Sequence, residues 1–160
     1  MDTESYIQRL IEISSKKYGL LEKVLQTYLL QEEELTAGGS ANQEPLISKR
    51  QELMDEIDKL DEQFHVYTER LKSTLGIISL EELSAFNVKK RDELKTVVAK
   101  ISTILGVLAD KHSQTERKLT VALQTTSDHV TQINKSRQVS RAYQTGGESK
   151  TTSVYYDKKK

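Results

Sequence analysis

A stretch of about fifty residues, from Asn87 to Arg137, contains no proline and only one glycine, Gly106. An uninterrupted stretch of this kind is typical of one long helix. Its first half carries apolar residues at the spacing of one helix face: Leu94, Val97, Val98, Ile101, Ile104, Leu105 and Leu108. Its second half keeps that spacing with fewer apolar residues: His112, Thr115, Leu119, Ala122, Thr126, His129, Val130 and Ile133. A helix face that weakens in this way predicts a surface for a partner rather than a completed core.

Two further helices are predicted before this stretch. The first covers residues 3–36 and is ended by the glycine-rich segment 37–42. The second covers residues 44–75 and begins near Pro45, because proline suits the first turn of a helix. Its apolar residues form two seven-residue rows: Leu46, Leu53, Leu60 and Tyr67, and Ile57, Phe64 and Leu71. This repeat favours near-parallel packing in the manner of a coiled coil.

The connection to the third helix contains a short helix of its own. Ser79 and Glu82 have the spacing of a capping box, which predicts a helix over about 80–85. Asn87 is then expected to cap a third helix over 87–136. The fold class is therefore all-α: an elongated antiparallel three-helix bundle or coiled coil over 1–137, with an overlong third helix and a flexible C-terminal tail over 138–160.

The predicted helix lengths are unequal. At about 1.5 Å per residue, the first two helices span about 45 Å each and the third about 75 Å. We therefore expect roughly 25–30 Å of the third helix to project past the other two, fold back or fray.

Composition excludes several classes of protein. The chain has no cysteine, so it forms neither a disulfide framework nor a thiolate metal site. No apolar run approaches the length of a membrane span, and the N-terminus lacks the features of a signal peptide. We therefore expect a cytoplasmic protein without membrane insertion.

The formal net charge of zero conceals a division along the chain. Residues 1–86 hold 9 Lys and Arg against 17 Asp and Glu, a net charge of −8, and residues 87–160 hold 15 against 7, a net charge of +8. The favoured interpretation is that two acidic helices pack against a basic third helix. Nucleic acid is not expected as a partner, because the basic residues lack the interleaved aromatic residues that stack on bases. An acidic protein partner and anionic lipid remain open alternatives.

Signatures of catalysis are weak. Neither glycine pair, Gly38-Gly39 or Gly146-Gly147, has the spacing of a phosphate-binding loop. Glu62 and His65 form a single Glu-x-x-His element, whereas paired-iron bundles need two copies and further carboxylates. His112 and Glu116 supply only two of the three or four ligands that zinc requires. We therefore predict that the protein is not an enzyme and holds no metal or other cofactor.

Three tyrosines, Tyr143, Tyr155 and Tyr156, fall within the predicted tail. Tyrosine provides contact area at low entropic cost and is enriched at binding hot spots. The three are either incidental tail residues or a docking element.

Four segments carry a resemblance: Leu21–Leu35, the segment Leu46–Met54 with Lys49, Gln51 and Leu53, Arg141–Gly147 with its tyrosine, and Ser153–Lys158. Together they resemble the FlgN family of flagellar type III export chaperones. The resemblance implies a cytoplasmic chaperone. It would bind the C-terminal amphipathic helices of flagellar hook-associated proteins, prevent their premature polymerisation and deliver them to the export apparatus.

The resemblance also implies roles for particular residues. The client helix would lie along the weak face of the third helix, on Leu119, Ala122, Leu123, Val130 and Ile133. Tyr143, which matches the family's tail tyrosine, would dock to the export gate, and Tyr155 and Tyr156 are further candidates for that docking. The alternative is a structural bundle without chaperone activity that forms a homodimer through its third helix.

Overall fold

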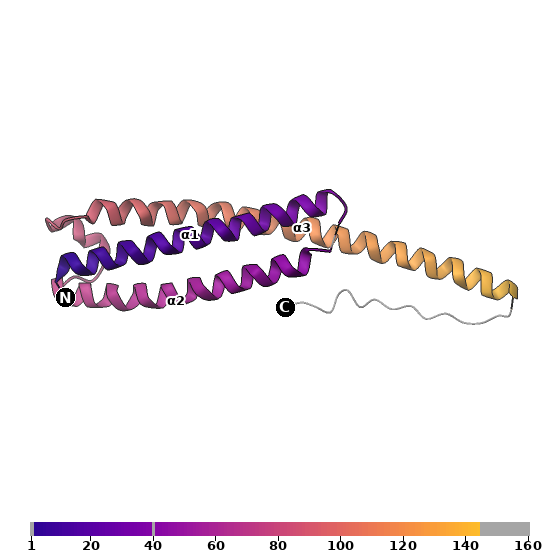
Figure 1. The fold of residues 1–160 in the computed structure, drawn as a ribbon, viewed down its shortest axis with the longest axis horizontal. Helices are drawn as coiled ribbons and strands as arrows, with labels where there is room; N and C mark the ends of the chain where they lie inside the picture. Colours follow the sequence, from indigo (N-terminus) through magenta and orange to yellow (C-terminus); the bar gives the residue numbers. More distant parts are fainter. Residues whose placement is uncertain (1, 40, 145–160) are drawn as a thin grey trace. The chain divides into compact units, whose positions relative to one another are not determined.

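The computed structural model of the chain describes residues 2–39 and 41–144. Its elements, in chain order, are α1 (Thr3–Thr36), α2 (Gln43–Leu75), the 3₁₀ helix η1 (Leu80–Ala85) and α3 (Arg91–Gln144) (Figure 1). The described residues contain no strand, so the predicted all-α class is confirmed. No helix in these two ranges is long and apolar enough to cross a membrane.

The chain divides into two compact units, Met1–Ser113 and Gln114–Lys160. In the first unit, α1, α2 and the beginning of α3 lie side by side, and consecutive helices run in opposite directions (Figure 1). The antiparallel three-helix arrangement predicted from the heptad rows is therefore present within this unit.

Local signals in the sequence set the ends of α1 and α2. The Asp2 carboxylate accepts the Ser5 backbone N–H at 2.8 Å, which lowers the pKa of Asp2 and caps α1. After α1, Gly38 takes a positive φ of 83°, in the region that favours glycine. Gly76 ends α2 in the left-handed conformation with φ 68°.

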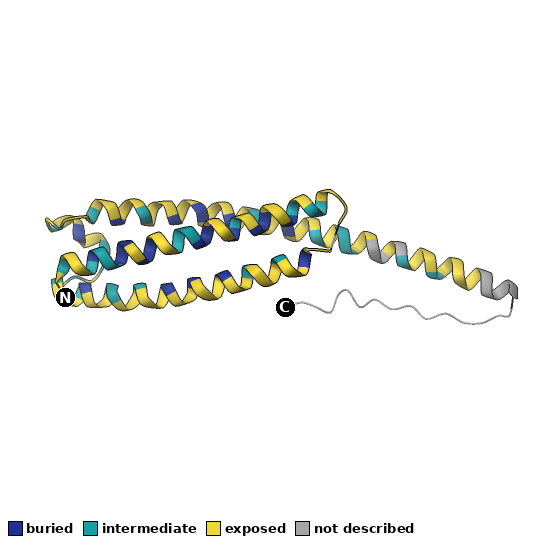
Figure 2. Cartoon of the chain, viewed as in Figure 1, coloured by how far each residue is buried: buried dark blue, intermediate teal, exposed yellow. Residues whose placement is uncertain are grey.

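The apolar rows of the first unit form two contiguous core clusters. The larger joins all three helices: Ile13, Leu20, Leu21, Val24, Tyr28, Leu53, Ile57, Leu60, Ile101, Ile104 and Leu108. The smaller lies where η1 joins the bundle: Ile7, Leu10, Ile11, Leu71, Leu83 and Leu94. Figure 2 shows the buried positions recurring along each helix among exposed ones, as expected of amphipathic helices that bury one stripe.

The predicted capping box is present at η1. The Ser79 hydroxyl accepts the Glu81 N–H at 3.2 Å, and the Glu82 carboxylate accepts the backbone N–H groups of Ile78 and Ser79 at 2.7 and 2.8 Å. These two backbone hydrogen bonds, with that from Ser79 the larger influence, lower the pKa of Glu82. Leu83, in the same turn, is buried in the smaller core cluster.

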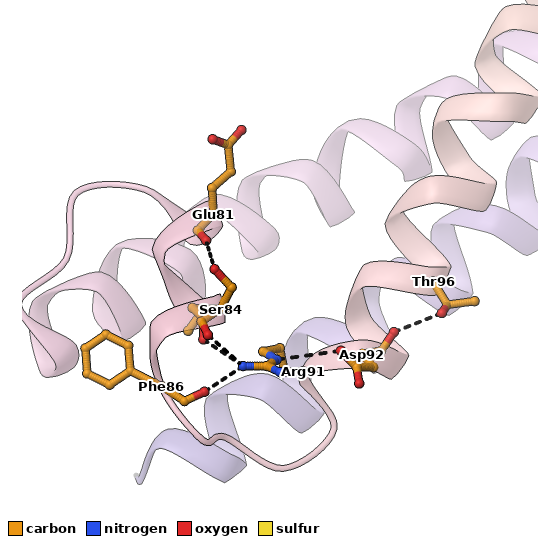
Figure 3. A network of polar contacts seen from close by, with 7 residues as sticks. Glu81, Ser84, Phe86, Arg91, Asp92 and Thr96 are labelled. Carbon is orange, nitrogen blue, oxygen red and sulfur yellow. Dashed lines mark hydrogen bonds and ion pairs between the residues drawn. The ribbon is translucent and has the colours of Figure 1, made fainter.

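The prediction that Asn87 caps the third helix is wrong. α3 begins at Arg91, directly after Lys90, which has a positive φ of 64°. The Arg91 guanidinium donates from Nη1 to the backbone oxygens of Leu83, Ser84 and Phe86 at 3.3, 3.1 and 2.8 Å (Figure 3). Because these carbonyl groups converge on one side chain, the segment between η1 and α3 is held out of the helix until Arg91.

The other end of α3 also differs from expectation. The helix continues past residue 136 to Gln144, the last residue that the structure describes. Residues 138–144 contain no glycine or proline, and the first strong helix-ending signal is the pair Gly146-Gly147. The predicted tail therefore loses residues 138–144 to α3, and its remaining residues lie outside the described part of the chain.

Candidate functional site

The second unit contains the residues predicted to bind a client. Among its described residues, 114–144, α3 is the sole element of secondary structure. At about 100° per residue, the five predicted residues fall within an arc of about 100°. Leu119, Ala122, Leu123 and Val130 are half-buried, and Ile133 is 39% exposed. We call these five residues the α3 stripe. The structure places them on one helix face.

Other predicted residues of this region are less fully described. Tyr143 lies in the last turn of α3, but its side chain is outside the described part of the chain, as are those of Thr126 and His129. Tyr155 and Tyr156 lie wholly outside the described residues. The export-docking assignment of the three tyrosines therefore stays a prediction.

A polar layer closes the end of the first unit's core nearest the α1–α2 loop. It consists of Thr27, Tyr28, Gln31, Gln43, Arg50 and His112. The Arg50 guanidinium lies 3.6 Å from the centroid of the Tyr28 ring, a cation–π contact. The same group donates to the Thr27 hydroxyl at 2.9 Å and to the Gln31 side-chain oxygen at 2.5 Å.

The polar layer joins all three helices of the first unit. The Gln31 side-chain amide of α1 donates to the Gln43 oxygen of α2 at 2.9 Å. The Tyr28 hydroxyl of α1 and Nδ1 of His112 of α3 share a hydrogen bond of 2.8 Å. Thr27, Gln31 and Gln43 are all buried, and such groups are tolerated in a core because they are hydrogen-bonded. The layer therefore fixes how the helices align with one another, since a shifted helix would leave these groups unpaired.

The sequence held a signal for the polar layer that the prediction missed. Gln43 and Arg50 stand at the start of the seven-residue row that continues as Ile57, Phe64 and Leu71. Gln31 similarly ends a row of α1 that contains Leu10 and Val24, with Lys17 between them. Polar residues that head or end apolar rows on neighbouring helices indicate a buried polar layer.

The candidate metal ligands do not gather into a site. Glu62 and His65 are both exposed on α2. Nδ1 of His112 lies at hydrogen-bond distance from the Tyr28 hydroxyl. The described residues contain no group of three or more His, Cys, Asp or Glu side chains placed to hold a metal ion. The absence of a metal or other cofactor and the absence of catalysis therefore stay predictions.

The charge division along the chain appears as two ion pairs between α1 and lysines that follow residue 87. Lys111 of α3 pairs with Glu32 of α1 at 3.1 Å, and both side chains are half-buried. Lys89 and Glu4 form a longer, exposed pair at 3.7 Å. Because exposed pairs contribute little, the Lys111–Glu32 pair is the one that matters for the position of α3 in the first unit.

Comparison with known proteins gives one match. A protein-family model described as "FlgN protein" matches residues 1–151, which is most of the chain. No curated protein and no solved structure matches.

Proposed function

The chain belongs to the FlgN family of flagellar export chaperones, and from this premise we propose that it binds the C-terminal amphipathic helices of flagellar hook-associated proteins. In this proposal the protein works in the cytoplasm, where it keeps its clients from polymerising and delivers them to the type III export gate. As a chaperone of this kind it acts by binding and needs no catalytic group or cofactor.

The observation that carries the proposal is the α3 stripe. In the described part of the second unit, one amphipathic helix holds five apolar residues on one face, and no other helix or strand of that part accompanies it. A helix that presents such a face is suited to bind the apolar face of a second helix, with contacts at three- and four-residue spacing. Leu119 and Leu123 lie one turn apart near the start of the stripe, so they are its best-placed anchors.

The experiment is calorimetric titration of the purified chain with the C-terminal helical segment of a hook-associated protein, at low and at high salt. We expect 1:1 binding of about micromolar affinity that tolerates salt, because apolar contacts are not screened by ions. Leu119→Asp with Leu123→Asp should abolish the binding while the melting temperature changes little. The matched control is Thr120→Asp with Gln124→Asp, which adds the same charges at the same spacing on exposed positions.

Three outcomes would contradict the proposal. If the double Leu variant bound the segment as tightly as the control, the client would not lie on the α3 stripe. If the folded wild-type chain released no binding heat and its mass rose with concentration, the self-associating bundle would be the better account. A large fall in melting temperature for the double Leu variant alone would identify the stripe as core.

We further propose that Tyr143, in the last turn of α3, docks to the export gate, with Tyr155 and Tyr156 as additional contacts. Tyr143→Ala should then lower client secretion in cells while leaving client affinity in vitro unchanged, and Gln138→Ala serves as the control. An equal loss of client affinity would place Tyr143 in the client site instead.

A further inference from the structure

The first unit contains an open groove that the α3 stripe does not include. The groove has a volume of about 1210 Å³ and lies between residues 18–29 of α1 and residues 95–107 of α3. α2 contributes no residue to its lining. Leu25, Leu29, Ile104 and Val107 are among the apolar residues that line it. Leu29 and Val107 are 40% and 41% exposed, so this apolar surface is open to solvent.

The edges of the groove are basic. Lys23 of α1 and Lys95 and Lys100 of α3 line it, against a single acidic residue, Glu22. Lys100 lies 4.8 Å from the centroid of the Tyr18 ring. Among the described residues none of the three lysines forms an ion pair within the chain. An apolar surface flanked by unpaired lysines is complementary to an apolar face flanked by acidic residues.

The dimensions of the groove suit a helix. The α1 wall, Tyr18–Leu29, rises about 16 Å at 1.5 Å per residue, which is three helical turns. An amphipathic helix of that length presents three or four apolar side chains to such a groove. Gly19 lines the α1 side of the groove without a side chain, and a Cβ built there would meet no atom within 4 Å.

A second copy of this chain fits the groove poorly. Two grooves facing each other would bring their lysine edges together. The acidic run of α2, from Asp55 to Glu62, has the complementary charge, but α2 forms no part of the groove. Pairing α2 of one copy with the groove of another joins two different surfaces, so a symmetric dimer would require both of these contacts to form at once.

We propose that the groove between α1 and α3 is a second docking site, which takes an amphipathic helix with acidic flanks from another protein. The site shares no residue with the α3 stripe.

The test uses a labelled peptide of fourteen or so residues, with a leucine stripe at helical spacing and glutamates on both flanks, followed by fluorescence anisotropy on the full chain. A counterpart peptide carries lysine in place of every glutamate. We expect the glutamate peptide to bind at least about tenfold more tightly than the lysine peptide, with a difference that shrinks as salt rises. Lys95→Glu with Lys100→Glu should reverse that preference.

A pair of variants with matched exposure locates the site. Leu29→Glu with Val107→Glu should weaken binding of the glutamate peptide about tenfold or more, because it places acid on the groove's apolar surface. Leu30→Glu with Val98→Glu, at positions that are 50% and 42% exposed and outside the groove lining, should leave binding unchanged. Circular dichroism confirms that both variants are folded.

Several results would overturn the inference. The first is no binding of the glutamate peptide, and the second is equally tight binding of both peptides. The third is equally tight binding of the glutamate peptide by the groove variant and its control variant. If the chain formed a concentration-dependent dimer and Leu29→Glu with Val107→Glu abolished it, the groove would bind a second copy of the chain. Leu119→Asp with Leu123→Asp separates this site from the proposed client site, since it should leave peptide binding intact.

Discussion

Removal of the Arg50 side chain tests whether the polar layer stabilises the first unit. Arg50 is the centre of that layer: its guanidinium contacts the Tyr28 ring and donates to Thr27 and Gln31. The change is Arg50→Ala. It removes these contacts at a position that is only half-buried.

The expected loss follows from those contacts. Gln31 is 1% exposed, so loss of the donor to its side-chain oxygen leaves a buried acceptor unpaired, at a cost of about 1–3 kcal/mol. The cation–π contact with Tyr28 adds about 0.5–2 kcal/mol. In the variant, water can reach part of the space that the guanidinium occupied, so the total loss of stability is smaller than the sum of these two contributions. We therefore expect the free energy of unfolding to fall by about 2–3 kcal/mol.

The assay is urea unfolding followed by circular dichroism at 222 nm. With a slope of about 1.5–2 kcal/mol per molar urea, the midpoint should fall by about 1–2 M without a change in slope. Lys49→Ala, the exposed neighbour of Arg50, is the control and should shift the midpoint little. A double-mutant cycle of Arg50→Ala with Gln31→Ala should give a coupling energy of about 1 kcal/mol or more.

A loss no larger than that of Lys49→Ala would refute the reasoning. In that case the side chain of Arg50 would contribute nothing beyond an ordinary surface cation, and the polar layer would not fix the alignment of the helices. Additive effects of Arg50→Ala and Gln31→Ala would refute the specific claim that these two residues act together.

Two further tests concern local structure. Gly106→Ala should raise the free energy of unfolding by about 0.5–1 kcal/mol, because a Cβ there meets no atom within 4 Å. Gly76→Ala should lower it by about 1 kcal/mol, because Gly76 has a φ of 68°. Thermal melts of both variants check this, and a change in the same direction for both would contradict it. Glu82 has a pKa below its ordinary value of 4.5, so its carboxylate stabilises the fold above pH 4.5, and that contribution is lost as the pH falls through the lowered value. The melting temperature of Glu82→Gln should therefore lie below wild type at pH 7 and approach it under acid, with Glu81→Gln as the control; a constant difference at all pH values would contradict the capping role.

The fold of the first unit was predictable because its apolar rows are regular. Leu53, Ile57 and Leu60 fall at helical spacing without interruption, and each is buried. The ends of the helices were less predictable where distant groups decide them. Asn87 has the right chemistry for a cap, but Arg91 binds three carbonyl groups of the preceding segment and delays the start of α3. That competition depends on tertiary geometry, which a local pattern does not contain.

The candidate sites show the same division. The α3 stripe followed from helical spacing alone, since residues such as Leu119 and Leu123 share a face on any helix. The groove did not, because its two walls lie about 75 residues apart in the chain and neither wall is unusual by itself. The polar layer was also missed, although Gln43 and Arg50 stand at the start of an apolar row and Gln31 at the end of another. A polar residue in such a row has no visible partner until the helices are placed side by side.

The continuity of α3 changes the thermodynamics of the second unit's helix. The first turn of a helix is unfavourable to form, with a nucleation constant of about 10⁻³, equivalent to about 4 kcal/mol, whereas each later residue adds at little cost. α3 runs unbroken from Arg91 to Gln144, and Leu94, Ile101 and Leu108 hold its early turns in the core. Residues after Ser113 therefore extend an existing helix and need no nucleus of their own. A protein that binds this segment meets a helix already formed, so less of its binding free energy is spent on ordering the chain.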